Sequence, residues 1–150
     1  VYYIDESNEF GLVAAMEDLQ APNWEGVHFW GCYGEEILGA DGESIGTGYQ
    51  NTLSIAAACS WTTTAASGTL AYESEGYSDW FLPSFDETQE MYFAIGQGAS
   101  NGNKGGFSNS WYWTSSQANE DIAWSFSFSN GTTFNFFKTS TFMIRPIRSF

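Results

Sequence analysis

The side chains that could support acid–base, nucleophilic or redox chemistry are few in this sequence. The one histidine, His28, lies between Val27 and Phe29, which favours a packed or hydrogen-bonded structural role and leaves little room for a Ser-His-Asp or Cys-His arrangement. Cys32 and Cys59 show no Cys-x-x-Cys spacing, so they predict either one disulfide bond or two buried thiols, and we favour the disulfide. We therefore expect no catalytic residues, no metal site and no cofactor.

Carboxylates are the other candidate groups, and three clusters of them could offer oxygen ligands to Ca²⁺. They lie at residues 5–9, 41–43 and 119–121, and none follows the spacing of an EF-hand loop. We interpret them as a solvated acidic surface. The cluster at Asn119–Asp121 is the best exception, and calcium held there would favour sugar binding of the lectin kind.

The charge balance excludes several classes of partner. The chain has 150 residues, with 18 Asp and Glu against 4 Lys and Arg, and a net charge of −14. All four cations lie after residue 103, whereas all but two of the acids precede it. Because nucleic acids, anionic lipids and sulfated glycans need clustered Lys or Arg, we expect no nucleic-acid partner. No apolar run approaches the roughly 20 residues of a spanning helix, so we also expect no membrane insertion.

Local patterns predict one domain over residues 1–150, with an α+β fold in which two helices pack on an antiparallel β-sheet. Residues 1–5 and 12–16 have the composition of a strand hairpin, and residues 50–59 hold helix formers. Ser84-Phe-Asp-Glu87 is a capping box that should begin a second helix ending at Gly96. Residues 21–48, with Trp24 and Trp30, should be irregular, and strands should fill the chain after Trp111.

Several separated segments match one family in order. They include Trp30-Gly-Cys-Tyr-Gly34, Asp79-Trp-Phe-Leu-Pro-Ser84, Tyr112-Trp-Thr-Ser-Ser116 and the closing Arg145-Pro-Ile-Arg-Ser-Phe150. In these segments the chain resembles the C-terminal domain of collagen-like bacterial adhesins, which has a C-type-lectin-like fold related to the formylglycine-generating enzymes. The resemblance implies that Arg145 and Arg148 form salt bridges with acidic residues, and that the scaffold comprises Trp80, Leu82, Pro83, Trp113, Trp124, Phe128, Arg145, Pro146 and Phe150.

Residues 118–143 carry a narrower resemblance. The part from Ser125 to Phe142 contains six Phe, four Ser, four Thr and two Asn. Randomising the adenines of an Asn codon yields Phe, Ser or Thr but never Glu, Gln, Met or Trp, so this segment resembles the variable region of proteins diversified by retroelements. The archaeal-virus branch of these proteins, built on the same adhesin-like domain, is the most similar.

The same segment can also be interpreted as an ordinary half-buried hairpin. Asn130-Gly131 predicts a two-residue turn, which would place Ser125 opposite Phe136 and Ser127 opposite Phe134, all on the solvent face. Exposed rings among small hydroxyls are typical of a binding face, so we favour ligand contact. The predicted contact residues are Asn119, Asp121, Ile122, Ser125, Ser127, Ser129, Thr132, Phe134, Phe136, Thr139, Ser140 and Phe142.

The resemblance implies a non-catalytic, hypervariable ligand-binding protein located outside the cell, on a virion or on a cell surface. Its partner would be an unknown protein or glycan on a cell surface, and homo-oligomers are compatible with this function. One alternative is an adhesin or glycan-binding domain of fixed specificity. A second is an enzyme of the formylglycine-generating type, which we disfavour because Cys32 and Cys59 lie elsewhere in the chain than that family's reactive pair.

Overall fold

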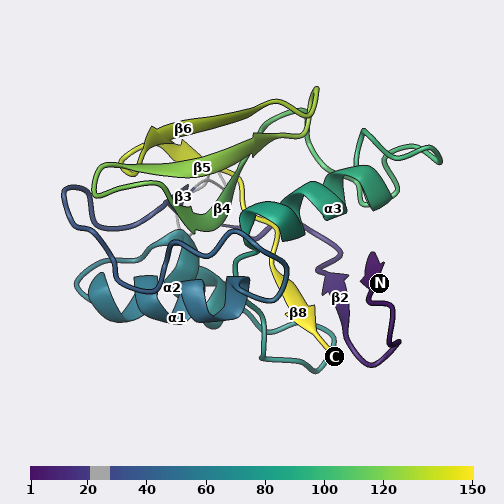
Figure 1. The fold of residues 1–150 in the computed structure, drawn as a ribbon, viewed down its shortest axis with the longest axis horizontal. Helices are drawn as coiled ribbons and strands as arrows, with labels where there is room; N and C mark the ends of the chain where they lie inside the picture. Colours follow the sequence, from purple (N-terminus) through teal and green to yellow (C-terminus); the bar gives the residue numbers. More distant parts are fainter. Residues whose placement is uncertain (21–27) are drawn as a thin grey trace.

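A computed structural model describes residues 1–20 and 28–150 of the chain (Figure 1). It has the mixed helix and sheet content of the predicted α+β class. Residues 21–27, including Trp24, lie outside the described part. Residues 30–47 are irregular as predicted, but His28–Phe29 forms a short strand where we expected irregular structure. The elements in chain order are β1 (Tyr3–Ile4), β2 (Gly11–Ala14), β3 (His28–Phe29), α1 (Gly48–Ala58), α2 (Ala65–Leu70), α3 (Phe85–Ile95), β4 (Trp111–Gln117), β5 (Ile122–Ser127), β6 (Thr133–Phe137), β7 (Thr141–Phe142) and β8 (Ile147–Ser149).

The strands form three small sheets whose ladders are all antiparallel, in the orders β1-β2-β8, β3-β7 and β4-β5-β6. The hairpin predicted at the start of the chain is confirmed, with Tyr3 opposite Leu12. Strand β8 joins its open side, and Gly11 and Phe150 exchange both backbone hydrogen bonds there. The two ends of the described chain therefore lie in one sheet, while the β4-β5-β6 sheet forms a separate layer above α1 and α2 (Figure 1).

The described residues contain three helices, not the two that we predicted. Helix α1 begins two residues earlier than expected, and α3 has both hydrogen bonds of its predicted capping box, between Ser84 and Glu87. The missed helix, α2, is 6 residues long and is capped by Thr64 and Ser67 in the same reciprocal manner. Its serine at the position where Glu or Gln is usual hid this signal in the sequence.

Two clusters of buried side chains form the core. One lies between α1, α2 and β4 and includes Trp30, Ile55 and Trp113. The other lies between α3 and the inner side of the β4-β5-β6 sheet and includes Tyr112, Phe126 and Phe128. Among the scaffold residues implied by the resemblance, Trp124 is half-buried, Phe150 is 52% exposed, and all the others are buried. No helix of the described chain has the length and apolarity to span a membrane.

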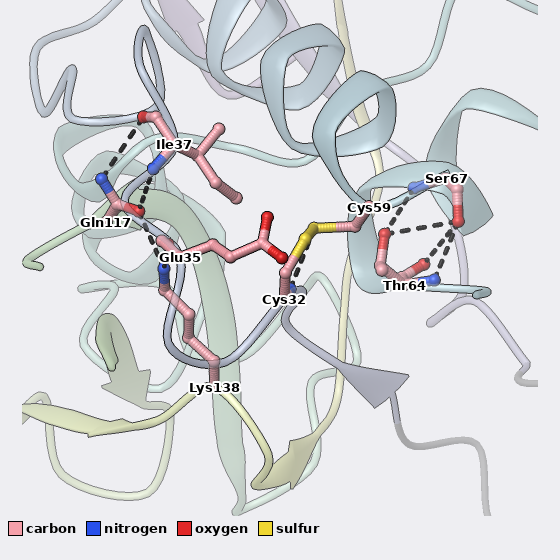
Figure 2. The surroundings of a disulfide bond; sticks show 8 residues. All are labelled: Cys32, Glu35, Ile37, Cys59, Thr64, Ser67, Gln117 and Lys138. Atoms are coloured by element: carbon pink, nitrogen blue, oxygen red, sulfur yellow. Dashed lines mark hydrogen bonds between the residues drawn. A yellow bond between two sulfur atoms is a disulfide. The ribbon is translucent and has the colours of Figure 1, made fainter. Parts of the chain in front are cut away.

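One covalent and two ionic links join segments that are far apart in the sequence. Cys32 and Cys59 are joined by a disulfide bond, as we favoured, and both are buried (Figure 2). Arg145 pairs with Asp18 at 2.7 Å and Arg148 pairs with Asp79 at 2.8 Å, which confirms that both arginines are bound to acidic partners. Because the Arg145 pair is buried, the loss of either partner would leave an uncompensated charge in the interior.

Candidate ligand-binding face

The candidate site is the face of the β4-β5-β6 sheet that α3 leaves open. Helix α3 covers the other face. There the ring of Phe85 packs edge-on against Trp124, with 5.2 Å between the ring centroids. The ring of Tyr92 packs on Phe126 and Phe128, with centroid distances of 5.2 and 5.5 Å. Successive side chains of a strand alternate between the two faces of a sheet. Side chains of β5 and β6 that do not meet α3 are therefore presented on the opposite side.

The hairpin between β5 and β6 has a longer connection than the two-residue turn that we predicted. Phe128 leaves the ladder to pack in the core, with ring centroids 4.3 Å from Phe107 and 4.6 Å from Tyr112. The chain then closes through residues 128–132, where the Gly131 N–H donates to the Ser127 carbonyl at 2.8 Å and Gly131 has a φ of +77°. The predicted register is wrong for this reason.

The observed register places Phe134 opposite Ser125 and Phe136 opposite Ala123. It differs from the prediction by two residues, and an even shift keeps every side chain on its original face. Phe134 and Phe136 therefore still share the face away from α3, as predicted. Phe134 is the most open of its rings, with 58% of its surface exposed.

Aromatic rings from three strands make contact on this face. Phe136 lies at the centre, 5.0 Å from Trp111 of β4, 4.9 Å from Phe134 and 4.9 Å from Phe142 of β7. Trp111, Phe136 and Phe142 are half-buried. We call these four residues, Trp111, Phe134, Phe136 and Phe142, the open aromatic face.

Two predicted contact residues are buried beneath this face, which corrects the expectation that they meet solvent. Ser125 is 0% exposed and Ser127 is 3% exposed. Each lies on the middle strand between larger residues, Ser125 between Trp113 and Phe134, and Ser127 beside Trp111. Ser125 Oγ donates to the Phe134 carbonyl at 2.9 Å, and Ser127 Oγ lies 2.7 Å from Ser129 Oγ. Their small size lets the flanking rings close over them.

The other predicted contact residues lie at the two ends of the hairpin. Ser129 and Thr132 are exposed at the turn, while Asn119 and Thr139 are exposed at the far end. Asn119 Oδ1 accepts the N–H groups of Asp121 and Ile122 at 2.8 and 3.1 Å, which fixes that loop. The half-buried members here are Asp121, Ile122 and Ser140.

Ile122 lies opposite Phe137 and so points to the α3 side of the sheet, away from Phe134 and Phe136. It is therefore not part of the open aromatic face. Of the predicted contact residues, the structure brings together Phe134, Phe136 and Phe142. It does not bring the residues of the turn, such as Ser129, close to those of the far end, such as Asn119.

Trp111 belongs to the face and was not predicted. The sequence did indicate it, because Trp111 and Trp113 are two residues apart and so lie on one face of β4. There they pair with Ser127 and Ser125 of β5. The partner strand could not be aligned from the sequence, because a bulge between Trp113 and Gln117 shifts the β4–β5 register.

Lys138 follows β6 and anchors the far end of the hairpin (Figure 2). It is fully buried, and its Nζ donates to the Glu35 carbonyl at 2.7 Å and to Gln117 Oε1 at 2.8 Å. Gln117 in turn accepts from the Ile37 N–H at 2.9 Å. Burial lowers the pKa of Lys138 to about 8, against the opposing effect of nearby carboxylates. Although it lies inside residues 118–143, Lys138 is scaffold.

The groups considered for chemistry take structural positions. His28 is buried in β3 opposite Phe142, and burial lowers its pKa. The disulfide occupies both cysteines. In the described part of the chain, no three His, Cys, Asp or Glu side chains converge as metal ligands would.

Comparison with known proteins gives one family. The model of the Lcl C-terminal domain matches residues 38–148, about three quarters of the chain. The match includes α1, α2, α3 and the β4-β5-β6 sheet. No curated protein matches the chain. The match supports the adhesin-like, ligand-binding class that the sequence motifs implied. The chain belongs to the Lcl C-terminal domain family.

Proposed function

We propose that this protein is a non-catalytic ligand-binding domain whose open aromatic face and hairpin ends are diversified by a retroelement. It acts outside the cell, on a virion or on a cell surface, where it recognises a protein or glycan of another surface. We infer that it belongs with the variable proteins of the archaeal-virus branch, on the composition of residues 118–143. The observation that carries this proposal is the exposure of Phe134 beside three half-buried rings, on the edge strand β6 of a sheet face whose inner part packs against the core.

The distribution of buried and exposed side chains along residues 118–143 supports the proposal. Buried side chains such as Phe126, Phe128 and Lys138 alternate or intersperse with exposed ones such as Ser129, Thr132 and Phe134. A diversified surface needs this arrangement, because the exposed positions can change while the buried ones hold the fold. Large rings among small hydroxyls also give contact area at low entropy cost together with adaptable hydrogen bonding.

The stable anchoring of the hairpin supports it further. The far end is fixed by Lys138 and by the Asn119 turn, and the near end by Phe128 in the core. A contact surface mounted on rigid elements loses less conformational entropy when it binds. Both sulfur atoms that the enzyme alternative would need are buried in a disulfide, which also favours binding over catalysis.

Two experiments test the proposal. Sequencing of many copies of the gene from its source population should find differences concentrated in codons of exposed hairpin residues and traceable to adenines of a nearby template copy; differences spread evenly over the domain would favour an adhesin of fixed specificity. A display library randomised at Ser129, Thr132, Phe134 and Thr139 should yield folded binders to several unrelated proteins. Folded variants that never bind any target would contradict the proposal.

A further inference from the structure

A second, separate hollow lies beside the disulfide. It has a volume of about 270 Å³ and is lined by three aromatic residues, Phe29, Tyr33 and Trp61, with Gly31, Thr62 and Thr139. The rings are unusually open, being 49%, 52% and 73% exposed. Only Thr139 belongs to residues 118–143, so the hollow is built by the fixed part of the chain. We call it the aromatic hollow.

The three rings come from segments that are linked to one another. Tyr33 directly follows Cys32, and Trp61 lies two residues after Cys59, so the disulfide joins the two segments that carry them. Phe29 pairs with Thr141 in the β3-β7 ladder, and the Trp30 N–H donates to the Lys138 carbonyl at 3.1 Å. The rings are therefore held apart around a space without needing to contact each other.

Charge decides which ligand this space suits. None of the residues that line it is charged, yet Glu35, Glu36, Glu120 and Asp121 are close enough to Lys138, the neighbour of Thr139, to act on its ammonium group. The Gly34 N–H donates to the Glu120 carbonyl at 3.0 Å, which brings these acidic segments to the same end of the hairpin. Lys138 itself is buried and turned inward, so it does not offset their field at the surface.

Negative charge also exceeds positive charge over the molecule as a whole. Arg145 and Arg148 are paired with Asp18 and Asp79, which leaves Lys104 as the one exposed, unpaired Lys or Arg among the described residues. The protein therefore attracts cations and repels anions over most of its surface. The faces of aromatic rings are also negative, and rings grouped around a space bind alkylated ammonium groups through cation–π attraction.

We propose that the aromatic hollow binds a methylated lysine side chain of a protein partner. A trimethylammonium group matches the uncharged aromatic lining, because it has lost its hydrogen-bond donors but kept its charge. The acidic segments at this end of the hairpin and the net charge of −14 favour a polypeptide that carries lysine and arginine near the methylated residue. They disfavour a choline phosphate head group, whose phosphate they would repel. The three rings of this site lie outside residues 118–143, and the site shares only Thr139 with the hairpin positions proposed to be diversified.

Nuclear magnetic resonance of the full chain with ¹⁵N-labelled tryptophan side chains tests the proposal. A short peptide with one Nε-trimethyl-lysine should shift the indole signal of Trp61 saturably, whereas the unmethylated peptide and its neutral tert-butyl isostere should bind at least tenfold more weakly. Trp61→Leu keeps an apolar side chain but removes the ring face, and should weaken binding about tenfold, as expected for the loss of roughly 1.4 kcal/mol of cation–π attraction.

Control variants separate this site from others. Phe93→Leu removes an equally exposed ring from α3, and Phe134→Ala removes the ring of the open aromatic face; both should leave the affinity for the methylated peptide unchanged. Equal binding of the neutral isostere, equal binding of unmethylated lysine, tighter binding of choline phosphate or of a neutral disaccharide, or no saturable shift would each overturn the proposal. Failure here leaves the display-library result for the hairpin unaffected.

Discussion

The rings of Trp111 and Phe136 lie 5.0 Å apart although their strands, β4 and β6, are separated by the whole width of β5. They can meet only because the strand between them carries Ala123, Ser125 and Ser127 on that face, whose side chains are too small to hold them apart. Because the two rings meet above them, Ser125 and Ser127 are buried beneath the open aromatic face and are not available to a ligand. Phe134, at the edge of this contact, keeps most of its ring in solvent.

The two phenylalanines of β6 should therefore differ in their effect on stability. Phe136→Ala removes the ring that contacts Trp111, Phe134 and Phe142, and should lower the free energy of unfolding by about 1 to 3 kcal/mol. Phe134→Ala should change it by less than about 0.5 kcal/mol, since the ring is largely exposed. Urea unfolding followed by tryptophan fluorescence measures both. Equal losses would mean that Phe134 is part of the packed core.

The turn of the hairpin offers a second matched pair. Phe128→Ala removes a fully buried ring packed on Phe107, Tyr112 and Tyr92, and should cost about 3 to 5 kcal/mol. Its neighbour in the sequence, Ser129, is exposed, and Ser129→Ala removes only its hydrogen bond with Ser127, so it should cost no more than about 1 kcal/mol. If a two-residue turn at Asn130-Gly131 formed in solution, Phe128 would stay in the ladder and the difference between the two variants would shrink.

This hairpin also marks how far the sequence could predict the structure. The capping box at Ser84 and the strand hairpin at Tyr3 are local signals, and both were predicted because neighbours in the chain determine them. The Asn130-Gly131 pair was an equally local signal but gave the wrong register. Tertiary packing of Phe128 decided the outcome there, and no local pattern reports that a particular ring fills a gap beside α3.

Stability should depend on pH through Lys138. Its pKa is lowered from 10.5 to about 8 in the folded protein, so between these values the unfolded chain binds a proton that the folded chain does not. The contribution of Lys138 to stability therefore rises from pH 8 to 10.5, by on the order of 2 kcal/mol. The neutral amine can still donate to Glu35 and Gln117.

Lys138→Met removes the titrating group and serves as the reference for this effect. The difference in unfolding free energy between the original protein and Lys138→Met should shift in favour of lysine between pH 7.5 and pH 10. Comparing the two proteins cancels the ionisation of tyrosines that both retain. A difference that stays constant over this range would show that the folded protein binds the proton as firmly as the unfolded chain.

The disulfide should stabilise the fold through the loop that it closes. Cys32 and Cys59 are separated by 27 positions, a loop for which chain entropy predicts roughly 3 to 4 kcal/mol. Replacing both cysteines by serine, or reducing the disulfide bond, should lower the free energy of unfolding by a similar amount. A loss below about 1 kcal/mol would indicate that packing of Trp30 and Ile55 alone fixes this region.

The sequence predicted which strand positions share the candidate face, but not which of their side chains are buried. Composition placed it in residues 118–143, and alternation placed Phe134 and Phe136 on one face. The alternation of side chains along one strand does not show whether rings of the adjacent strands cover that strand. Ser125 and Ser127 were therefore predicted to meet solvent, although Trp113 and Trp111 beside them bury both. Burial in a sheet depends on the side chains of adjacent strands, which requires the register to be known.

Exposed residues of the hairpin should be replaceable, whereas the buried residues beneath them should not. Two variants measured by guanidinium unfolding test it most directly: one carries Ser129→Asp, Thr132→Tyr, Phe134→Ser and Thr139→Asp, and the other carries Ser125→Tyr and Ser127→Tyr. The fourfold variant should retain its unfolding free energy to within about 1 kcal/mol, whereas the double variant should lose about 3 kcal/mol or more through overpacking. A fourfold variant as unstable as the double variant would contradict the account.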